Sequence, residues 1–165
     1  MDAHKLRALL KEHMPNADDG TATHILEAVE TTKLPLSYAL ALVEKESGGR
    51  NVYGHDKVRN PAPKGGRVTA RNYAAYKKAR KAGMGMQGVG HTQLTWYALQ
   101  DAADALGGCW RPYPNLVVGF SNLKRLTNVH GKEAGAAAYN GTGPAAEAYG
   151  RDFVRKQEAW HRRVT

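Results

Sequence analysis

Apolar residues recur at helical spacing along most of the chain, whereas the strict alternation typical of half-buried strands is weak everywhere. The pattern predicts helices from Thr21 or Thr23 to residue 32, and over residues 4–13, 36–47, 70–81, 96–106, 114–130, 133–139 and 150–163. We therefore expect a mainly α fold. A small β element is the one exception that the pattern allows, in the polar stretch at 50–68.

Several helix boundaries are marked by residues that favour the ends of helices. Gly48-Gly49 are expected to end the helix at 36–47. Thr69 and Thr95 are expected to cap the helices that follow them, because a threonine hydroxyl can accept a hydrogen bond from a free N–H group of the first turn.

The composition narrows the class of protein. A chain of 165 residues is long enough for one domain with its own core. The excess of 24 basic over 15 acidic residues, a net charge of +9, favours a polyanionic partner such as nucleic acid, an anionic membrane surface or a bacterial wall. The single cysteine excludes an internal disulfide, and the seven histidines lack the spacing of a metal site, so neither metal nor cofactor is expected. No apolar run is long enough to cross a bilayer and no signal peptide is visible, which predicts synthesis in a cytoplasm without membrane insertion.

One carboxylate has an unusual position on its predicted helix. On a helical wheel, Glu46 falls beside Ala39 and Val43 on the edge of the apolar face, whereas Lys45 points away from it. Burial against apolar surface raises the pKa of a carboxyl group, and so does the negative end of the helix dipole. A glutamic acid that is still protonated near neutral pH can donate its proton to a glycosidic oxygen. The alternative is a boundary residue whose carboxylate reaches solvent.

Four short motifs follow one another along the chain. They are Glu46-Ser47-Gly48-Gly49 at the end of an apolar helix, then Gly88-Val89-Gly90-His91-Thr92-Gln93-Leu94, then Asn115-Leu116 with Gly119 and Leu123, and finally Ala138-Tyr139-Asn140-Gly141. Over residues 34–160 this succession resembles the lysozyme-like lytic transglycosylases, a superfamily that includes the goose-type lysozymes. It is most similar to the glycosidase domains of phage endolysins that act on actinobacteria.

The resemblance implies an activity and a domain organisation. It implies one lysozyme-like domain at 1–165, with N-terminal helices at 1–33 before a catalytic core at 34–165. Such a domain cleaves the β-1,4 bond between N-acetylmuramic acid and N-acetylglucosamine in peptidoglycan, by hydrolysis or by lytic transglycosylation. An endolysin remains in the host cytoplasm until it is released onto the cell wall.

The resemblance also assigns roles to residues. Glu46 matches the catalytic acid, Gly90 and Gln93 match an element that lines the sugar groove, and Tyr139 and Asn140 match an element beside the acid. Three further residues complete the expected substrate contacts, namely Ser47, Tyr53 and His91. For His91, a buried histidine without a ligand is the alternative interpretation.

Aromatic side chains divide into two groups. Tyr53 and Tyr139 lie in or beside loops and are the better candidates for stacking on a sugar. Tyr73, Tyr76 and Trp96 lie at helical spacing among apolar neighbours, and we expect them to pack in the core.

Hydrolysis would require a second group to position water or to stabilise the developing positive charge. Asp56 is the candidate, because it lies ten residues after Glu46 in a polar stretch of a length that is often functional. The alternative is an aspartate that bonds to its own backbone in a turn. The basic insert at 57–85 is expected to form a lid or a wall of the substrate site.

Two functions without catalysis remain as alternatives. The basic runs at 77–81 and 162–163 allow a nucleic-acid-binding module, although no recognition motif accompanies them. A basic module that binds the cell wall without cleaving it is the other. We expect an enzyme that acts as a monomer on peptidoglycan and does not bind nucleic acid.

Overall fold

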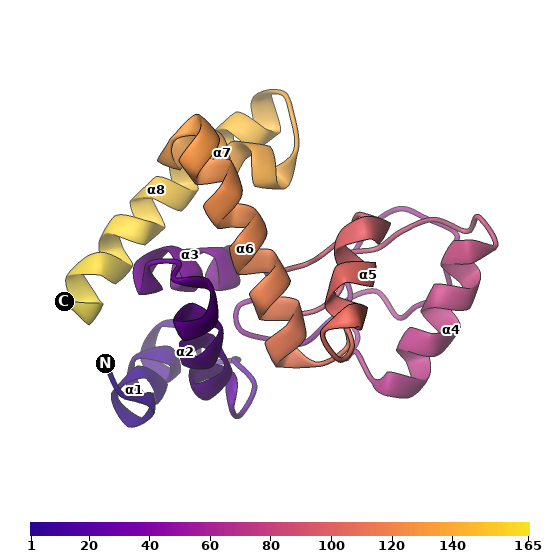
Figure 1. The fold of residues 1–165 in the computed structure, drawn as a ribbon, viewed down its shortest axis with the longest axis horizontal. Helices are drawn as coiled ribbons and strands as arrows, with labels where there is room; N and C mark the ends of the chain where they lie inside the picture. The colour runs from indigo at the N-terminus through magenta and orange to yellow at the C-terminus, as the bar shows by residue number, and fades with distance from the viewer.

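The computed structural model describes residues 1–165 and confirms a mainly α fold. The eight helices, shown in Figure 1, are α1 (Ala3–His13), α2 (Thr21–Thr32), α3 (Leu36–Glu46), α4 (Ala70–Lys81), α5 (Tyr97–Ala105), α6 (Pro112–His130), α7 (Lys132–Asn140) and α8 (Pro144–Val164). The expected β element is reduced to isolated bridges, which pair Val52 with Arg67, Tyr53 with Val89, and Val89 with Leu94. No helix has the combination of length and hydropathy that crossing a membrane requires.

Of the two threonines that are expected to cap helices, one does and the other does not. Thr69 caps α4 as expected, since its hydroxyl accepts from the N–H of Asn72 at 3.1 Å while the Asn72 side chain accepts from the N–H of Thr69 at 2.8 Å. Thr95 does not cap α5, because its hydroxyl donates to the carbonyl of Gln93 and the helix begins two residues later. The helix α2 begins at Thr21, one of the two predicted starts, and Gly20 in the left-handed region precedes it without a side-chain cap.

The last helix begins six residues earlier than the pattern predicts, at Pro144 rather than at Gly150. Proline suits the first turn of a helix because that turn has no acceptor for its missing N–H. Gly150 is an interior residue of α8 that lets α7 approach closely, since a Cβ at this position would lie 2.5 Å from the carbonyl oxygen of Glu133. Gly150, which the pattern marks as the start of a helix, is therefore an interior residue that allows α7 and α8 to pack closely.

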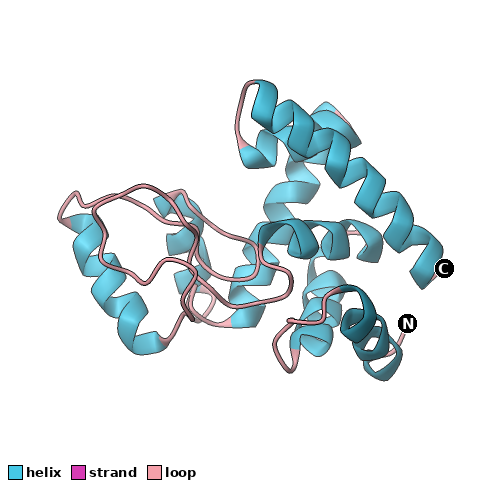
Figure 2. Ribbon diagram, turned by 180° about the vertical axis from the view of Figure 1, so that it is seen from behind, coloured by secondary structure: helices cyan, strands magenta, loops and turns pink.

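The buried apolar side chains form two clusters. The larger one joins α1, α2, α3, α6, α7 and α8, which we call the helical lobe, and includes Leu40, Phe120, Phe153 and Trp160. The smaller one lies within residues 51–111 with α4 and α5, which we call the loop-rich lobe, and also contacts Val118 of α6. Figure 2 shows that most of the irregular chain gathers in the loop-rich lobe, next to α4 and α5.

Of the three aromatic residues expected in the core, two are there. Tyr73 and Tyr76 are buried and stack on each other with ring centres 5.8 Å apart. Trp96 is 56% exposed, so its expected burial is wrong. It precedes the first residue of α5, where the backbone is still extended and the side chain lies outside the packed face of the helix.

Buried amide side chains replace regular secondary structure in the loop-rich lobe. The Nδ2 of Asn115 donates to the carbonyl of Val89 at 2.8 Å, and its Oδ1 accepts from the N–H of Thr92 at 3.0 Å. The side chain of Gln100 likewise donates to the carbonyls of Gln87 and Leu94. These bonds satisfy backbone groups that would otherwise be buried without partners.

Candidate functional site

Glu46 is the last residue of α3, and the chain turns away directly after it. Gly48 and Gly49 have φ angles of 62° and 85°, which glycine adopts without strain. The hydroxyl of Ser47 donates to the carbonyl of His91 at 2.8 Å, and the hydroxyl of Thr21 donates to the carbonyl of Gly49 at 3.0 Å. The turn that follows Glu46 is thus tied to both lobes, which fixes the position of the carboxyl group.

The surroundings of Glu46 hold its carboxyl group in an unusual electrostatic state. Burial raises the pKa of this group from 4.5 to about 7, and the hydroxyl of Tyr149 and the charge of Lys45 each act in the opposite direction. The Tyr149 hydroxyl donates to Oε1 of Glu46 at 2.5 Å. The side chain of Lys45 forms an ion pair with Asp152 and lies 4.3 Å above the Tyr149 ring. A carboxyl group in this state is poised to exchange a proton near neutral pH.

The carboxyl group of Glu46 lines a polar cavity of ≈ 360 Å³. We call it the Asp56 hollow, and it is lined by Glu46, Gly54, His55, Asp56, Gln93, Thr95, Tyr139 and Asn140. The structure therefore brings together five of the residues predicted for the site, although they come from α3, from two loops and from the end of α7.

Two of these residues are held by the backbone of the loop-rich lobe. Gln93, at a φ of 50°, donates from Nε2 to the carbonyls of Val52 and Gly90 at 2.8 and 2.9 Å. Asp56 accepts at Oδ2 from the N–H of Gly88 at 2.8 Å. Asp56 is thus a fixed carboxylate that faces the same cavity as Glu46.

Glycine is required beside these groups. A Cβ on Gly54 would lie 2.5 Å from Oδ2 of Asp56 and 2.7 Å from Oε1 of Gln93. A Cβ on Gly88 would lie 2.4 Å from the same oxygen of Gln93. The absence of side chains at these two positions gives the polar groups the space they occupy.

Tyr139 and Asn140 form the wall of the Asp56 hollow that α7 contributes. The hydroxyl of Tyr139 donates to the carbonyl of Thr92 at 2.7 Å, and burial raises the pKa of this hydroxyl. Asn140 is exposed at the end of the helix, where its side chain is free to contact a ligand.

Four residues predicted to contact substrate do not line the Asp56 hollow. The first is Ser47, whose hydroxyl bonds to the carbonyl of His91. His91 is 1% exposed, lies 3.2 Å from the Thr21 hydroxyl through Nε2, and has a pKa lowered to about 4 because its charged form is poorly solvated. Gly90 packs on Asn115, where a Cβ would lie 2.4 Å from Nδ2. Tyr53 is fully buried and donates from its hydroxyl to Asn72 at 2.8 Å, so its ring is not available to stack on a sugar. The structure thus places His91, Gly90 and the Tyr53 ring beneath the Asp56 hollow and not on its surface.

A second cavity of ≈ 480 Å³ meets the first at Glu46. We call it the basic hollow, and it is lined by Lys45, Glu46, Ser47, Gly48, Arg50, Val52, Tyr53, Gly54, His55, Lys64, Gly65 and Gln93. The two cavities share four lining residues, Glu46, Gly54, His55 and Gln93, and we refer to them together as the polar cleft.

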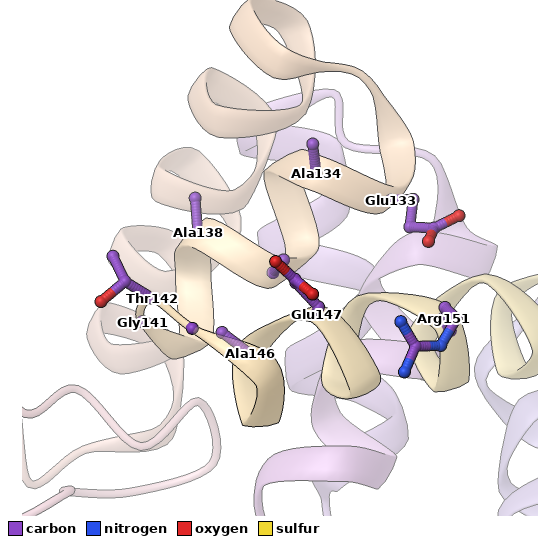
Figure 3. A pocket seen from close by; sticks show the side chains of 10 residues that line it. Glu133, Ala134, Ala138, Gly141, Thr142, Ala146, Glu147 and Arg151 are labelled. Carbon is purple, nitrogen blue, oxygen red and sulfur yellow. The ribbon is translucent and has the colours of Figure 1, made fainter.

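A third cavity of ≈ 520 Å³ lies apart from this cleft, between α7 and the start of α8. Figure 3 shows that alanines such as Ala134, Ala138 and Ala146 line it, with Glu133, Glu147 and Arg151 around them. Glu133 and Glu147 are exposed, so neither has the apolar environment that distinguishes Glu46. We therefore assign the candidate site to the cleft at Glu46.

The sequence did not indicate the role of Tyr149. Its hydroxyl bonds to the acid across 103 positions in the chain. Its place on α8 follows from packing between helices, and no local spacing signals it. The structure has no group of three or more His, Cys, Asp and Glu side chains that could hold a metal ion.

Comparisons with protein-family models, with curated proteins and with solved structures found no match.

Proposed function

We propose that this chain is a peptidoglycan glycosidase of the endolysin type, which cleaves the β-1,4 bond between N-acetylmuramic acid and N-acetylglucosamine. One observation carries the proposal. The carboxyl group of Glu46 has a pKa raised to about 7 by burial and opens onto a polar cleft that a second carboxylate, Asp56, also faces. The succession of motifs supports the same interpretation, and the net charge of +9 suits an anionic cell wall.

In the proposed reaction, Glu46 is the general acid. It donates its proton to the glycosidic oxygen, the bond to the anomeric carbon breaks, and positive charge develops on the sugar ring. Glu46, now a carboxylate, then accepts a proton from the group that attacks the anomeric carbon. The Tyr149 hydroxyl stabilises the carboxylate that forms, since a hydrogen bond to the charged form of an acid lowers its pKa.

The attacking group distinguishes two reactions. In hydrolysis it is a water molecule, which Asp56, lining the same cavity, would orient. In lytic transglycosylation it is the hydroxymethyl oxygen of the muramic acid itself, and Asp56 would only stabilise the positive charge. The fixed position of Asp56, held by the N–H of Gly88, serves either role.

The substitution Glu46→Gln tests the proposal. It keeps the size of the side chain but removes the proton donor, so we expect the release of glycan fragments from purified peptidoglycan to fall about a hundredfold or more. The matched control is Glu147→Gln, which removes an exposed carboxylate from the cavity between α7 and α8 and should leave the rate unchanged. A Glu46→Gln variant that still releases fragments at the rate of the native chain would contradict the assignment and favour a module that only binds the wall.

Mass spectrometry of the fragments separates the two reactions. Reducing ends indicate hydrolysis, and anhydro ends indicate transglycosylation. If water is the attacking group, Asp56→Asn should reduce the release of reducing ends more than tenfold. If the sugar hydroxyl attacks, the anhydro products should persist at a moderately lower rate.

A further inference from the structure

The two hollows that meet at Glu46 differ in charge. The Asp56 hollow carries Asp56 and neutral polar groups, with His55 as its only basic residue. The basic hollow carries Lys45, Arg50, Lys64 and the same His55, and its only acid is Glu46, which holds its proton up to about pH 7. A ligand that crosses the cleft therefore meets opposite electrostatic environments on the two sides of the reacting group.

Two of the basic side chains have no partner within the protein. Lys45 is neutralised by its ion pair with Asp152. Arg50 and Lys64 are exposed, and their side chains form no ion pair and no hydrogen bond. Their charges are available to an anionic group bound in the basic hollow.

The backbone fixes the position of both residues. Arg50 follows the glycine turn at the end of α3. Lys64 lies in a turn that is bonded to the backbone of Tyr53. The N–H of Tyr53 donates to the carbonyl of Gly66, and the N–H of Gly65 donates to the carbonyl of Tyr53, both at 2.9 Å. Gly65 has a φ of 70°, and a Cβ there would lie 2.8 Å from the His55 ring, so the turn packs closely on the cleft.

We infer that the basic hollow binds the free carboxylates of the peptide stem attached to N-acetylmuramic acid, through Arg50 and Lys64. This inference rests on the proposed function and extends it to substrate selection. In the glycan strand only the muramic acid carries a peptide, and its neighbour is an uncharged N-acetylglucosamine. Arg50 and Lys64 attract carboxylates, whereas Asp56 repels them, so the stem lies on the side of the basic hollow and the uncharged sugar occupies the Asp56 hollow. The charges thus set the register of the strand across Glu46.

The test compares two forms of one substrate. Peptidoglycan is first stripped of phosphate-containing polymers, so that only stem carboxylates supply negative charge, and half of it is then converted to the amide form with carbodiimide and ammonia. The native chain should cleave the carboxylate form about tenfold faster than the amide form at low salt. In the double variant Arg50→Gln/Lys64→Gln this ratio should fall to near one. The matched control Lys78→Gln/Arg162→Gln removes one lysine and one arginine that are exposed and unpaired outside the cleft, and should keep the ratio of the native chain.

Binding separates a failure of this inference from a failure of the proposed function. Co-sedimentation of Glu46→Gln with each form of peptidoglycan should show the same preference for the carboxylate form, and Arg50→Gln/Lys64→Gln should abolish it in this background. If the double variant keeps the preference of the control, the assignment of the stem to the basic hollow is overturned while the glycosidase proposal stands. If the native chain cleaves neither form, the proposed function fails, even where the binding preference is found.

Discussion

The two lobes of this protein are stabilised in different ways. In the helical lobe, apolar side chains from six helices pack into one cluster, and the backbone bonds are made within the helices. In the loop-rich lobe, a smaller cluster is supplemented by buried side chains such as Gln87, Gln100 and Asn115. These amides hold a backbone that forms only isolated β-bridges and no strands.

This difference explains how the cleft is built. The helical lobe supplies the reactive carboxyl group from the end of a buried helix, where apolar neighbours withhold water from it. The loop-rich lobe supplies Asp56 and Gln93, which need an irregular backbone to reach the same cavity. A rigid helix suits a group whose solvation must be controlled, and a loop held by amides suits groups that must converge from distant positions.

The largest change in the free energy of unfolding is expected in the loop-rich lobe, where a buried side-chain amide bonds to backbone groups that have no partner in a helix or sheet. Asn115→Ala removes the partner of the Val89 carbonyl and of the Thr92 N–H, and leaves a cavity, so the free energy of unfolding should fall by about 4 kcal/mol. Hydrogen exchange should accelerate first at the amide of Thr92. Asn128, which is exposed on the same helix, provides the control, because Asn128→Ala should change stability by less than about 0.5 kcal/mol. Equal effects of the two substitutions would show that the buried amides do not hold the loop-rich lobe.

Much of the helical lobe could be predicted from the sequence, because its helices are amphipathic and its helix ends carry local signals. The position of Glu46 on the edge of an apolar face is such a local property, which the helical spacing alone predicts. The loop-rich lobe is less predictable, because side-chain bonds such as that of Asn115 to Val89 join residues 26 positions apart. His91 illustrates the limit, because a histidine between a glycine and a threonine gives no sign of whether it faces the cleft or the interior.

The next largest effect is a change in stability with pH, which we expect from the carboxyl group of Glu46 in the helical lobe. Its pKa of about 7 in the folded chain exceeds the value of 4.5 expected after unfolding, so ionisation costs the folded state about 3 kcal/mol. This cost is absent below pH 4.5, where both states are protonated, and is complete above pH 7. Glu46→Gln should therefore stabilise the chain by up to about 3 kcal/mol at pH 8 and by almost nothing at pH 4. Denaturant unfolding at the two pH values measures this difference, and a variant that is less stable than the native chain at pH 8 would show that Glu46 is not poorly solvated.

The smallest effect is a shift in the pH dependence of cleavage, which we expect when the hydrogen bond from Tyr149 of α8 to Glu46 is removed. Tyr149→Phe removes the hydrogen bond that favours the carboxylate of Glu46, so the pKa of this group should rise further. The alkaline limb of the profile of cleavage rate against pH should then move upward by up to about one pH unit. Tyr113→Phe is the control, since that hydroxyl bonds to Thr31 far from the cleft. A profile that moves downward, or moves equally in the control, would exclude a direct action of Tyr149 on the acid.

The most direct test is a titration of the Glu46 carboxyl carbon by nuclear magnetic resonance, with Glu46→Gln used to assign the signal. We expect a midpoint near pH 7, because the carboxyl group of Glu46 is poorly solvated and the Tyr149 hydroxyl only partly offsets that effect. A midpoint near 4.5, the value of a glutamate in water, would mean that Glu46 is ionised at neutral pH and has no proton to give to a glycosidic bond.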